Sequence, residues 1–298
     1  MTTMTTSSST TTTKRSRPPR LKPPPLKWHG GKWYLAGKLH HLAMAHTHRT
    51  HSFAGGLGEF WNWPHEEVSE VVNDIDGDLT NFWRVLQDVT TFNRFMRIVQ
   101  AIPFSQVEWE DSLIPAGEPV QRAVKFFVRC RQSMSGRKQE FAPLSKTRVR
   151  RAMNEQASAW LSAVDGLPMV HHRLKRVVIL NMPAIDVIQS QDGRTTLHYV
   201  DAPYVLDTRV TVGEYGPFEM TDDQHRELIR VLLRCEGKVM VSMYHHPIYD
   251  VLHLEHGWQV HEFDLPNNAS AADVKERKIE CVWCNYILPP VPAGILQH

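Results

Sequence analysis

Residues 50–64 read "THSFAGGLGEFWNWP" and place three glycines between a short apolar segment and a cluster of aromatic side chains. This order predicts a strand, a glycine-rich loop and a helix in succession. Glycine lets the backbone come close to another group, although a short glycine run after a strand is often only a tight turn. No Gly-Lys-Ser/Thr sequence follows, so the loop is not a phosphate-binding loop of the P-loop type.

Strand and helix patterns alternate on both sides of this stretch. Residues 26–43 carry apolar side chains at helical spacing, and residues 69–88 contain an apolar triplet ending at Asn73-Asp74, a turn and an amphipathic helix. Thr221 is placed to cap a helix over 221–235. Further strands are predicted over 176–181, 196–204, 237–244 and 280–288. The alternation predicts an α/β fold with a mostly parallel sheet and helices on both faces.

The overall composition is that of an ordinary globular protein. The 298 residues are 42% hydrophobic and 22% charged, and their formal net charge is +2. This balance excludes a global attraction to nucleic acid, so any such binding must come from locally clustered cations. The four cysteines are few for this length, and no leader or membrane-length apolar run is found. We therefore expect a cytoplasmic protein with no membrane partner.

Three parts of the chain differ in composition. Residues 1–25 are rich in Thr and Ser, then basic and proline-rich, which predicts a disordered basic tail. A transit peptide is the alternative, but no amphipathic apolar face supports it. The stretch 91–176 is largely helical and basic, with loops around Pro115–Pro119 and Met134–Pro143. We expect it to be a second region inserted within a sheet domain formed by residues 26–90 and 177–291; the family resemblance given below implies that this insert recognises the target.

The insert carries many more cations than acids, and such a cluster can release counterions from a phosphate backbone. A merely solvated charged face is the alternative. The segment "SKTRVRRAMNEQASAWL" (145–161) has the pattern of a helix with a basic start, where the arginines oppose the helix dipole unless phosphates neutralise them. The predicted DNA contacts are Arg131, Arg137, Lys138, Lys146, Arg148, Arg150 and Arg151.

The stretch "LHYVDAPY" (197–204) combines a strand pattern with an acid, a restricted backbone and an aromatic ring. Pro203 disfavours helical geometry at Ala202 and so limits where the Ala202 carbonyl can point. Asp201 adds acceptor oxygens, and Tyr204 offers a ring face. Together they would suit a flat, amino-bearing base, whereas the plainer interpretation is a strand that ends in an Asp-x-Pro turn.

Ligands of open parallel sheets bind beyond the carboxyl ends of the strands. The glycine loop at 55–58 follows one strand, and Asp74 follows the next. Glycines admit close approach and an acid accepts hydrogen bonds from sugar hydroxyls, so this pair fits a small molecule with a ribose.

Five ordered segments resemble the Dam-like (alpha-group) DNA adenine-N6 methyltransferases. They are "KWHGGK" (27–32), "FAGG" (53–56), "VVNDIDGDLTNFWRVL" (71–86), "YVDAPY" (199–204) and "VSMYHHPIYDVL" (241–252). The middle region also resembles a phage- and bacterium-associated branch of that family. The resemblance covers residues 26–290 and implies a Rossmann-like methyltransferase sheet with an inserted, mainly helical DNA-recognition region.

The resemblance also implies roles for individual residues. It implies S-adenosylmethionine as cofactor, with Asp74 at its ribose, and double-stranded DNA as partner. We expect a monomer with a role in restriction-modification, although the sequence contains no signal for the oligomeric state or for a restriction partner. The resemblance implies a pocket for a flipped-out adenine in which Asp201 and the Ala202 carbonyl accept the amine protons and Tyr204 stacks on the base. The implied catalytic residues are Asp201, Ala202, Pro203 and Tyr204. The implied cofactor-binding residues are Trp28, Gly30, Lys32, Phe53, Ala54, Gly55, Gly56 and Asp74.

Three residues depart from the family pattern. Ala202 replaces the first proline of the usual motif, Pro183 stands where relatives often carry an acid, and Met243 replaces a common glycine and would add bulk beside the pocket. These departures keep a catalytically weakened, DNA-binding relic as an alternative. An amino-methyltransferase that acts on RNA or on a protein amide is a third hypothesis.

Two groups of side chains could ligate a metal, but no metal site is predicted. The histidines at positions 40, 41, 46, 48 and 51 lack cysteine or carboxylate support and are expected on a helix surface and a loop. Cys281 and Cys284 have zinc-knuckle spacing, but on a strand they point to opposite faces. His245 and His246 could edge the pocket without a catalytic role.

Overall fold

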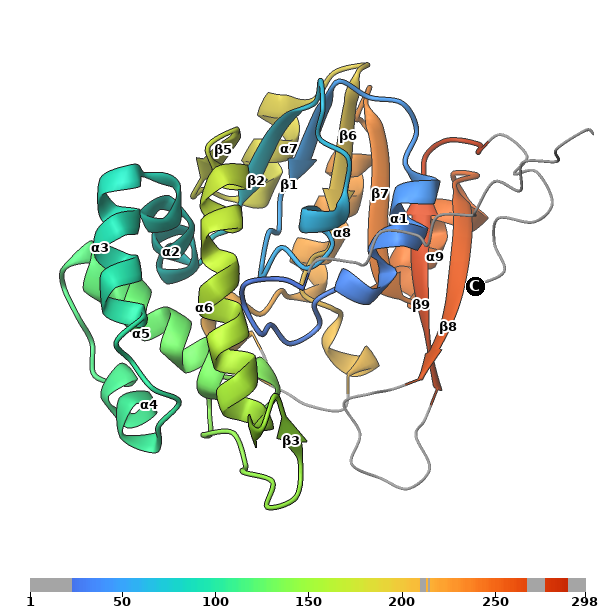
Figure 1. Ribbon diagram of the computed structural model, residues 1–298. Coiled ribbons are helices and arrows are strands. Elements are labelled where there is room, and N and C mark those ends of the chain that lie inside the picture. Colours follow the sequence, from blue (N-terminus) through green and yellow to red (C-terminus); the bar gives the residue numbers. More distant parts are fainter. Residues whose placement is uncertain (1–22, 210–212, 214, 267–276, 289–298) are drawn as a thin grey trace, which may run out of the picture.

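A seven-stranded sheet forms the centre of the computed structural model, which describes residues 23–209, 213, 215–266 and 277–288 (Figure 1). The strand order is β5-β2-β1-β6-β7-β9-β8. The first five strands in this order pair in parallel, and β9 pairs antiparallel with β7 and β8. The strands are β1 (His48–His51), β2 (Ser69–Asn73), β5 (Val177–Leu180), β6 (Thr196–Val200), β7 (Lys238–Tyr244), β8 (Gln259–Pro266) and β9 (Arg277–Cys284).

Helices cover both faces of the sheet. The side chains of Val239 and Val241 on β7 belong to one buried cluster, and Met240 between them belongs to another, as the two-residue period of a strand requires. The first cluster includes helices α8 (Asp222–Leu232) and α9 (Pro247–Leu254), with α7 (Ala184–Gln191) beside them. The second lies under α1 (Ala36–Leu42) and the short 3-10 helix η1 (Trp33–Leu35). The predicted α/β fold, with a mostly parallel sheet between helices, is confirmed.

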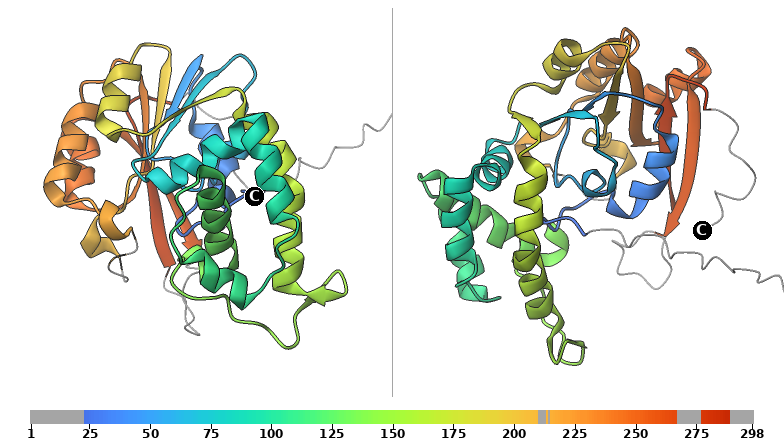
Figure 2. Two further views of the ribbon diagram at one scale, coloured as in Figure 1. Left: turned by 90° about the vertical axis from the view of Figure 1, so that its left-hand side faces the viewer. Right: turned by 45° about the horizontal axis from the view of Figure 1, so that its top comes forward.

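Five helices form a separate bundle beside the β2–β5 edge of the sheet (Figure 2). All five, α2 to α6, lie between β2 and β5 in the chain, and α2 packs against α5 and α6. Their bounds are α2 (Gly77–Gln87), α3 (Val89–Val99), α4 (Gln106–Ser112), α5 (Pro119–Gln132) and α6 (Glu155–Leu174).

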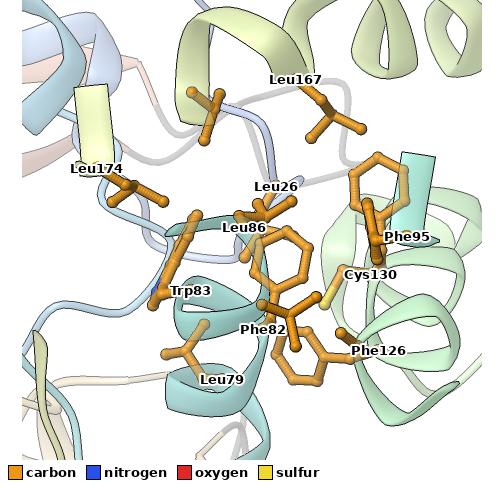
Figure 3. Close-up of a cluster of buried hydrophobic side chains, with 14 of the residues drawn as sticks. Leu26, Leu79, Phe82, Trp83, Leu86, Phe95, Phe126, Cys130, Leu167 and Leu174 are labelled. Carbon is orange, nitrogen blue, oxygen red and sulfur yellow. The ribbon is translucent and has the colours of Figure 1, made fainter. Parts of the chain in front are cut away.

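Aromatic side chains fill the core of this bundle (Figure 3). Phe82 of α2 is fully buried, stacks on Phe127 with ring centroids 5.9 Å apart and meets Phe95 and Phe126 at similar distances. Burying a phenylalanine stabilises a fold by roughly 1.5–3 kcal/mol, and well-oriented ring pairs add to this. Because α2 follows β2 directly, this core fixes the bundle against the sheet.

Side-chain caps set several helix starts. The Asp76 carboxylate accepts hydrogen bonds from the backbone N–H groups of Asp78 and Leu79, so α2 begins directly after the loop that carries Asp74. Thr221 forms a capping box with Gln224, which confirms its predicted role as N-cap of α8.

The aromatic residues after the glycine loop do not form the predicted α-helix. They make one turn of 3-10 helix, η2 (Phe60–Asn62), and Trp63 is extended with ψ 141°. Pro64 explains the extended backbone, because the residue before a proline is disfavoured in helical geometry. Phe60, Trp61 and Trp63 are all buried, so the short turn lets them point into different parts of the core.

The basic start predicted for the helix over 145–161 is also wrong. Residues 149–154 form a hairpin of β3 (Val149–Arg150) and β4 (Met153–Asn154), and α6 begins at Glu155 with Asn154 as its cap. The turn residues Arg151 and Ala152 have φ of 53° and 57°, the geometry of a tight two-residue hairpin turn. Arg148, Arg150 and Arg151 therefore precede the helix and do not oppose its dipole.

Strand β8, at the edge of the sheet, is not among the strands that the sequence pattern predicts. His48 and His51 lie on β1, not on the helix surface and loop expected for them. Within the described residues, no helix combines the length and apolar character needed to cross a bilayer. Residues 1–22 of the tail predicted over 1–25 lie outside the described residues, as do the last three residues of the expected sheet domain, 289–291. Residues 23–25 are described, and Pro25 is buried, so the prediction of a tail is wrong for this residue.

Candidate active site

The carboxyl ends of three adjacent strands are tied together by one asparagine side chain. Asn73 ends β2, and its side-chain amide N–H groups donate to the carbonyls of Ser52 after β1 and Met182 after β5, each at 3.0 Å. Its side-chain oxygen accepts from the Met182 N–H. Asn73 is 1% exposed, so these bonds are shielded from water. The loops that leave this edge of the sheet are thereby held at fixed separations.

The glycine loop lies against the indole of Trp28. A Cβ added to Gly55 would come within 2.9 Å of the Trp28 ring, and one added to Gly56 within 2.4 Å of the Trp28 Cβ. Gly55 also has a φ of 47°, in the left-handed region that favours glycine. The loop can approach Trp28 this closely only because these residues are glycines. The glycine run is therefore more than the ordinary tight turn that the sequence left as an alternative.

Asp74 holds the loops after β1 and β2 together. Its carboxylate accepts hydrogen bonds from the backbone N–H of Gly55 at 2.8 Å and of Asp76 at 3.0 Å. Burial raises the pKa of Asp74 to about 6, although these bonds oppose the shift. Each carboxylate oxygen has a further lone pair with which to accept from a ligand hydroxyl.

A pocket of about 660 Å³ opens at this edge of the sheet. All eight residues predicted to bind a cofactor line it, from Trp28 in the first segment to Asp74 after β2. Asp201 and Pro203, after β6, line the same pocket. Its volume lies in the range of small-molecule sites, and it mixes apolar side chains with a few converging polar groups.

Lys32, Asp201 and Glu280 form a buried charged cluster at this pocket. The Lys32 ammonium lies 3.2 Å from an Asp201 carboxylate oxygen and 3.9 Å from a Glu280 oxygen. It also donates to the Gly30 carbonyl at 3.0 Å. Burial raises the pKa of Asp201 to about 7 against the opposing influence of Lys32, and burial also raises the pKa of Glu280. Although burial disfavours its charge, the two carboxylates raise the pKa of Lys32 well above its usual value.

The side chains of Ala202 and Tyr204 point away from the pocket. Both belong to the buried cluster formed with α8 and α9, and the Tyr204 ring is only 5% exposed. Its hydroxyl donates to Glu280, and the Lys32 ammonium lies 4.6 Å from its ring centroid. The open ring face expected for Tyr204 is therefore not present, because Lys32 covers it.

Two of the three departures from the family pattern lie where they could matter. Pro183 lines the pocket as the N-cap residue of α7, and Ala202 places its methyl group in the core. Met243 is fully buried in the cluster formed with α8 and α9 and is not among the residues that line the pocket. The expectation that Met243 adds bulk beside the pocket is corrected by this position.

The seven predicted DNA contacts fall into three places. Lys146, Arg148 and Arg150 are exposed at the hairpin end of α6, whereas the Arg151 guanidinium bonds to Ser158 on α6. Arg137 and Lys138 line the pocket, and the Lys138 ammonium lies 4.5 Å from the centroid of the Trp28 ring.

Arg131 lies in the third place, inside the helical bundle. Its guanidinium is enclosed between α5 and α6, where it donates to the Ala159 carbonyl, and burial lowers its pKa to about 10. This position corrects the expectation of a surface cation at 131, because the group is used to join two helices.

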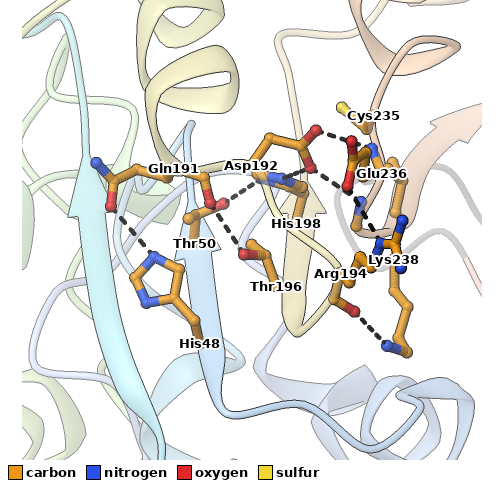
Figure 4. Close-up of polar contacts among 12 residues, drawn as sticks. His48, Thr50, Gln191, Asp192, Arg194, Thr196, His198, Cys235, Glu236 and Lys238 are labelled. Atoms are coloured by element: carbon orange, nitrogen blue, oxygen red, sulfur yellow. Dashed lines mark hydrogen bonds and ion pairs between the residues drawn. The ribbon is translucent and has the colours of Figure 1, made fainter.

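A second polar cluster lies at the opposite end of β6 (Figure 4). Within the described residues, ligand atoms of Asp192, His198 and Cys235 come within 4.8 Å of one another, close enough for a metal ion. Each of these groups already has a protein partner: Asp192 accepts from His198 and from the backbone N–H of Glu236 and Gly237, and the Cys235 thiol meets the Val231 carbonyl. These hydrogen bonds give the cluster a structural role, because Asp192 joins the loop before β6 to the loop before β7.

Sequence reasoning missed Asn73 and Glu280 as site residues. The sequence pattern marks Asn73 only as the end of a strand. Glu280 opens the apolar run "ECVWC" (280–284), and an acid at the start of a buried strand is a signal that could have pointed to it.

The model of one protein family matches most of the chain. It is described as D12 class N6 adenine-specific DNA methyltransferase, and the match covers residues 28–263. That range includes the pocket, the helical bundle and β1 to β7. No curated protein sequence matches the chain.

Proposed function

Because the chain belongs to the D12 class N6 adenine-specific DNA methyltransferase family, we propose that it methylates the N6 atom of an adenine flipped out of double-stranded DNA, with S-adenosylmethionine as donor. The observation that carries this proposal is one pocket lined both by the eight predicted cofactor residues and by Asp201. The carboxyl edge of a parallel sheet is where such a fold binds its ligand.

The residues present fit this cofactor. The bare backbone of Gly55 and Gly56 lies against Trp28 with no room for a side chain, and all three residues line the pocket. Asp74 has acceptor capacity left for ribose hydroxyls. Pro183 and Ala184 at the start of α7 offer an apolar surface to a purine ring. When bound there, S-adenosylmethionine supplies an electrophilic methyl group.

Asp201 and the Ala202 carbonyl would hold the adenine amine. The lone pair of this nitrogen is delocalised into the ring, and the nitrogen gains positive charge as it forms its new bond. An ionised Asp201 and a neutral carbonyl that accept hydrogen bonds from its two N–H groups favour that charge, and one such well-placed partner is worth roughly 3–4 kcal/mol. Lys32 contacts one oxygen of Asp201, so the other oxygen is available to the amine.

Pro203 and Tyr204 would shape the base pocket in different ways. Pro203 faces the pocket and restricts the backbone at Ala202. Tyr204 supports this segment from behind through Glu280, and stacking of a base on its ring requires Lys32 to leave that face.

The hairpin at the end of α6 is the part of the insert best placed to meet DNA (Figure 2). Lys146, Arg148 and Arg150 are exposed there, together with the apolar side chains of Leu144 and Val149. Cations in such a position neutralise phosphates, whereas apolar side chains can contact bases or sugars.

Labelled S-adenosylmethionine distinguishes this function from its two alternatives. Purified protein is incubated with unmethylated duplex DNA, RNA or protein extract, and the products are hydrolysed and separated. Label in N6-methyladenine from DNA supports the proposal. Duplex binding without label would indicate a catalytically weakened relic, and label only in RNA or protein would indicate another amino-methyltransferase.

A further inference from the structure

Glu280 is a buried acid to which neither the family resemblance nor the predicted chemistry gives a role. It lies on β9, is 3% exposed and pairs in register with Tyr244 of the neighbouring β7. Its carboxylate accepts from the Tyr204 hydroxyl and lies 3.9 Å from the Lys32 ammonium. A charged side chain at such a position costs stability unless its surroundings compensate, so its presence calls for an explanation.

The charges around Glu280 do not balance. Among the described residues, Asp201 and Glu280 share Lys32 as their one close cation, so the cluster has one negative charge in excess when both acids are ionised. Glu59 is also buried, and its negative charge raises the pKa of Asp201 further. The close partner of Glu59 is His51, with which it forms a hydrogen bond. Within the same part of the chain, the other titratable groups on which Glu280 acts are a thiol and four phenols, which cannot supply a positive charge: Cys281, Tyr34, Tyr199, Tyr204 and Tyr244.

The excess charge lies just behind the pocket wall. Lys32 and Asp201 line the pocket, whereas Glu280 is not among the lining residues and stands on their far side. Without Glu280, Lys32 would neutralise Asp201, and Glu59 would be the remaining acid that acts on this end of the pocket. With Glu280, the same end carries one more negative charge and attracts a cation more strongly.

We propose that Glu280 is a positioning residue that gives the pocket its preference for a positively charged ligand, so that the sulfonium form of the cofactor is favoured over its uncharged demethylated product. This inference rests on the proposed function and concerns the binding step alone. Glu280 acts by holding Lys32 and Tyr204 in place and by sharing the charge of Lys32, without touching the ligand.

The test is isothermal titration calorimetry of three ligands against wild type and Glu280→Gln. The ligands are S-adenosylmethionine, S-adenosylhomocysteine, which lacks the charge, and sinefungin, in which a protonated amine replaces the sulfonium. Glutamine keeps an acceptor for the Tyr204 hydroxyl and removes only the charge. We expect the affinity for both cationic ligands to fall about tenfold relative to that for S-adenosylhomocysteine, as a Coulombic interaction across a partly buried site predicts.

Two control variants separate this effect from structural damage. Glu262→Gln removes an acid from the exposed side of neighbouring β8 and should leave all ligand preferences unchanged. Tyr204→Phe removes the hydroxyl contact but leaves the Glu280 charge, so the preference for cations should persist. Thermal denaturation establishes that each variant is folded.

Each other result would overturn the inference in a recognisable way. If Glu280→Gln weakened all three ligands equally, Glu280 would have a structural role only. If it left all three affinities unchanged, its charge would not reach the ligand, and the proposed function would stand without this inference. If wild type bound none of the three ligands, the proposed function would fail, and this inference with it.

Discussion

The Lys32 ammonium lies 3.2 Å from a carboxylate oxygen of Asp201, inside a site where the side chain of Lys32 is 5% exposed and that of Asp201 19% exposed. The first segment of the fold and the end of β6 thus meet in one ion pair. Removal of one member of a buried pair leaves the other uncompensated, but here Glu280 remains as a second partner for Lys32. Substitutions of Asp201 should therefore leave the protein folded.

Asp201→Ala should reduce methyl transfer by at least about a hundredfold, because it removes the acceptor that favours charge on the adenine amine. Binding of S-adenosylhomocysteine should stay within about threefold of wild type, since the glycine loop and Asp74 are unaffected. Single-turnover label transfer and calorimetry measure the two quantities. Full turnover by the variant would exclude the proposed role of Asp201.

The rate should depend on pH through Asp201. Its pKa of about 7 is raised mainly by burial, and only the ionised carboxylate supplies the negative charge that stabilises the positive charge on the amine. The value of kcat/KM should therefore rise about tenfold per pH unit below 7 and level off above it. Because Glu280 also raises the pKa of Asp201, the rising limb should move to lower pH in Glu280→Gln. Profiles measured from pH 5.5 to 9 that coincide for the two proteins would contradict this assignment.

Gly56→Ala should weaken cofactor binding at least about tenfold. The new methyl group would come within 2.4 Å of the Trp28 Cβ, so that either the loop or the indole must move out of the pocket wall. Gly37→Ala is the matched control, because Gly37 is an exposed residue of α1 with nothing within 4 Å of its added Cβ. That change should stabilise the protein by about 0.5–1 kcal/mol and leave binding unaltered. Equal affinities in both variants would mean that the loop does not form the cofactor site.

Arg148→Ala and Arg150→Ala should each reduce the salt dependence of duplex binding. The slope of log affinity against log salt should fall by roughly 0.9 for each phosphate that the variant no longer neutralises. Arg226→Ala, on exposed α8, should leave the slope unchanged. Fluorescence anisotropy between 50 and 200 mM salt provides the measurement, with DNA length held constant. A slope that responds to Arg226 but not to the hairpin arginines would place the DNA on another face.

The sheet and the pocket could be predicted from the sequence because the chemistry is local to strand ends. Asp74 and Asp201 each follow a buried strand directly, and parallel strands bring such positions to one edge. Trp28, from a segment that is not itself a strand, joined the site only through the family resemblance. Contacts such as that between Trp28 and Gly56 depend on tertiary packing that no short pattern contains.

The errors have equally specific causes. The turn at Arg151 and Ala152 has left-handed backbone at two residues that do not favour it, so the hairpin was mistaken for the start of α6. Charge alone predicts Arg131, Arg137 and Lys138 as DNA contacts; packing places Arg131 between α5 and α6, whereas Arg137 and Lys138 line the pocket and stay predicted contacts. Charge along a sequence does not show which side of a helix or loop faces solvent.

Gly136 links the two halves of the proposed mechanism. A Cβ at this position would lie 2.3 Å from the Lys27 carbonyl, so the loop that follows α5 is pressed against the segment that carries Trp28. The Lys27 ammonium, in turn, donates to the Ser133 carbonyl. A shift of the insert on a duplex would move one wall of the cofactor pocket. Thermodynamic reciprocity then requires that DNA and cofactor alter each other's affinity by the same factor.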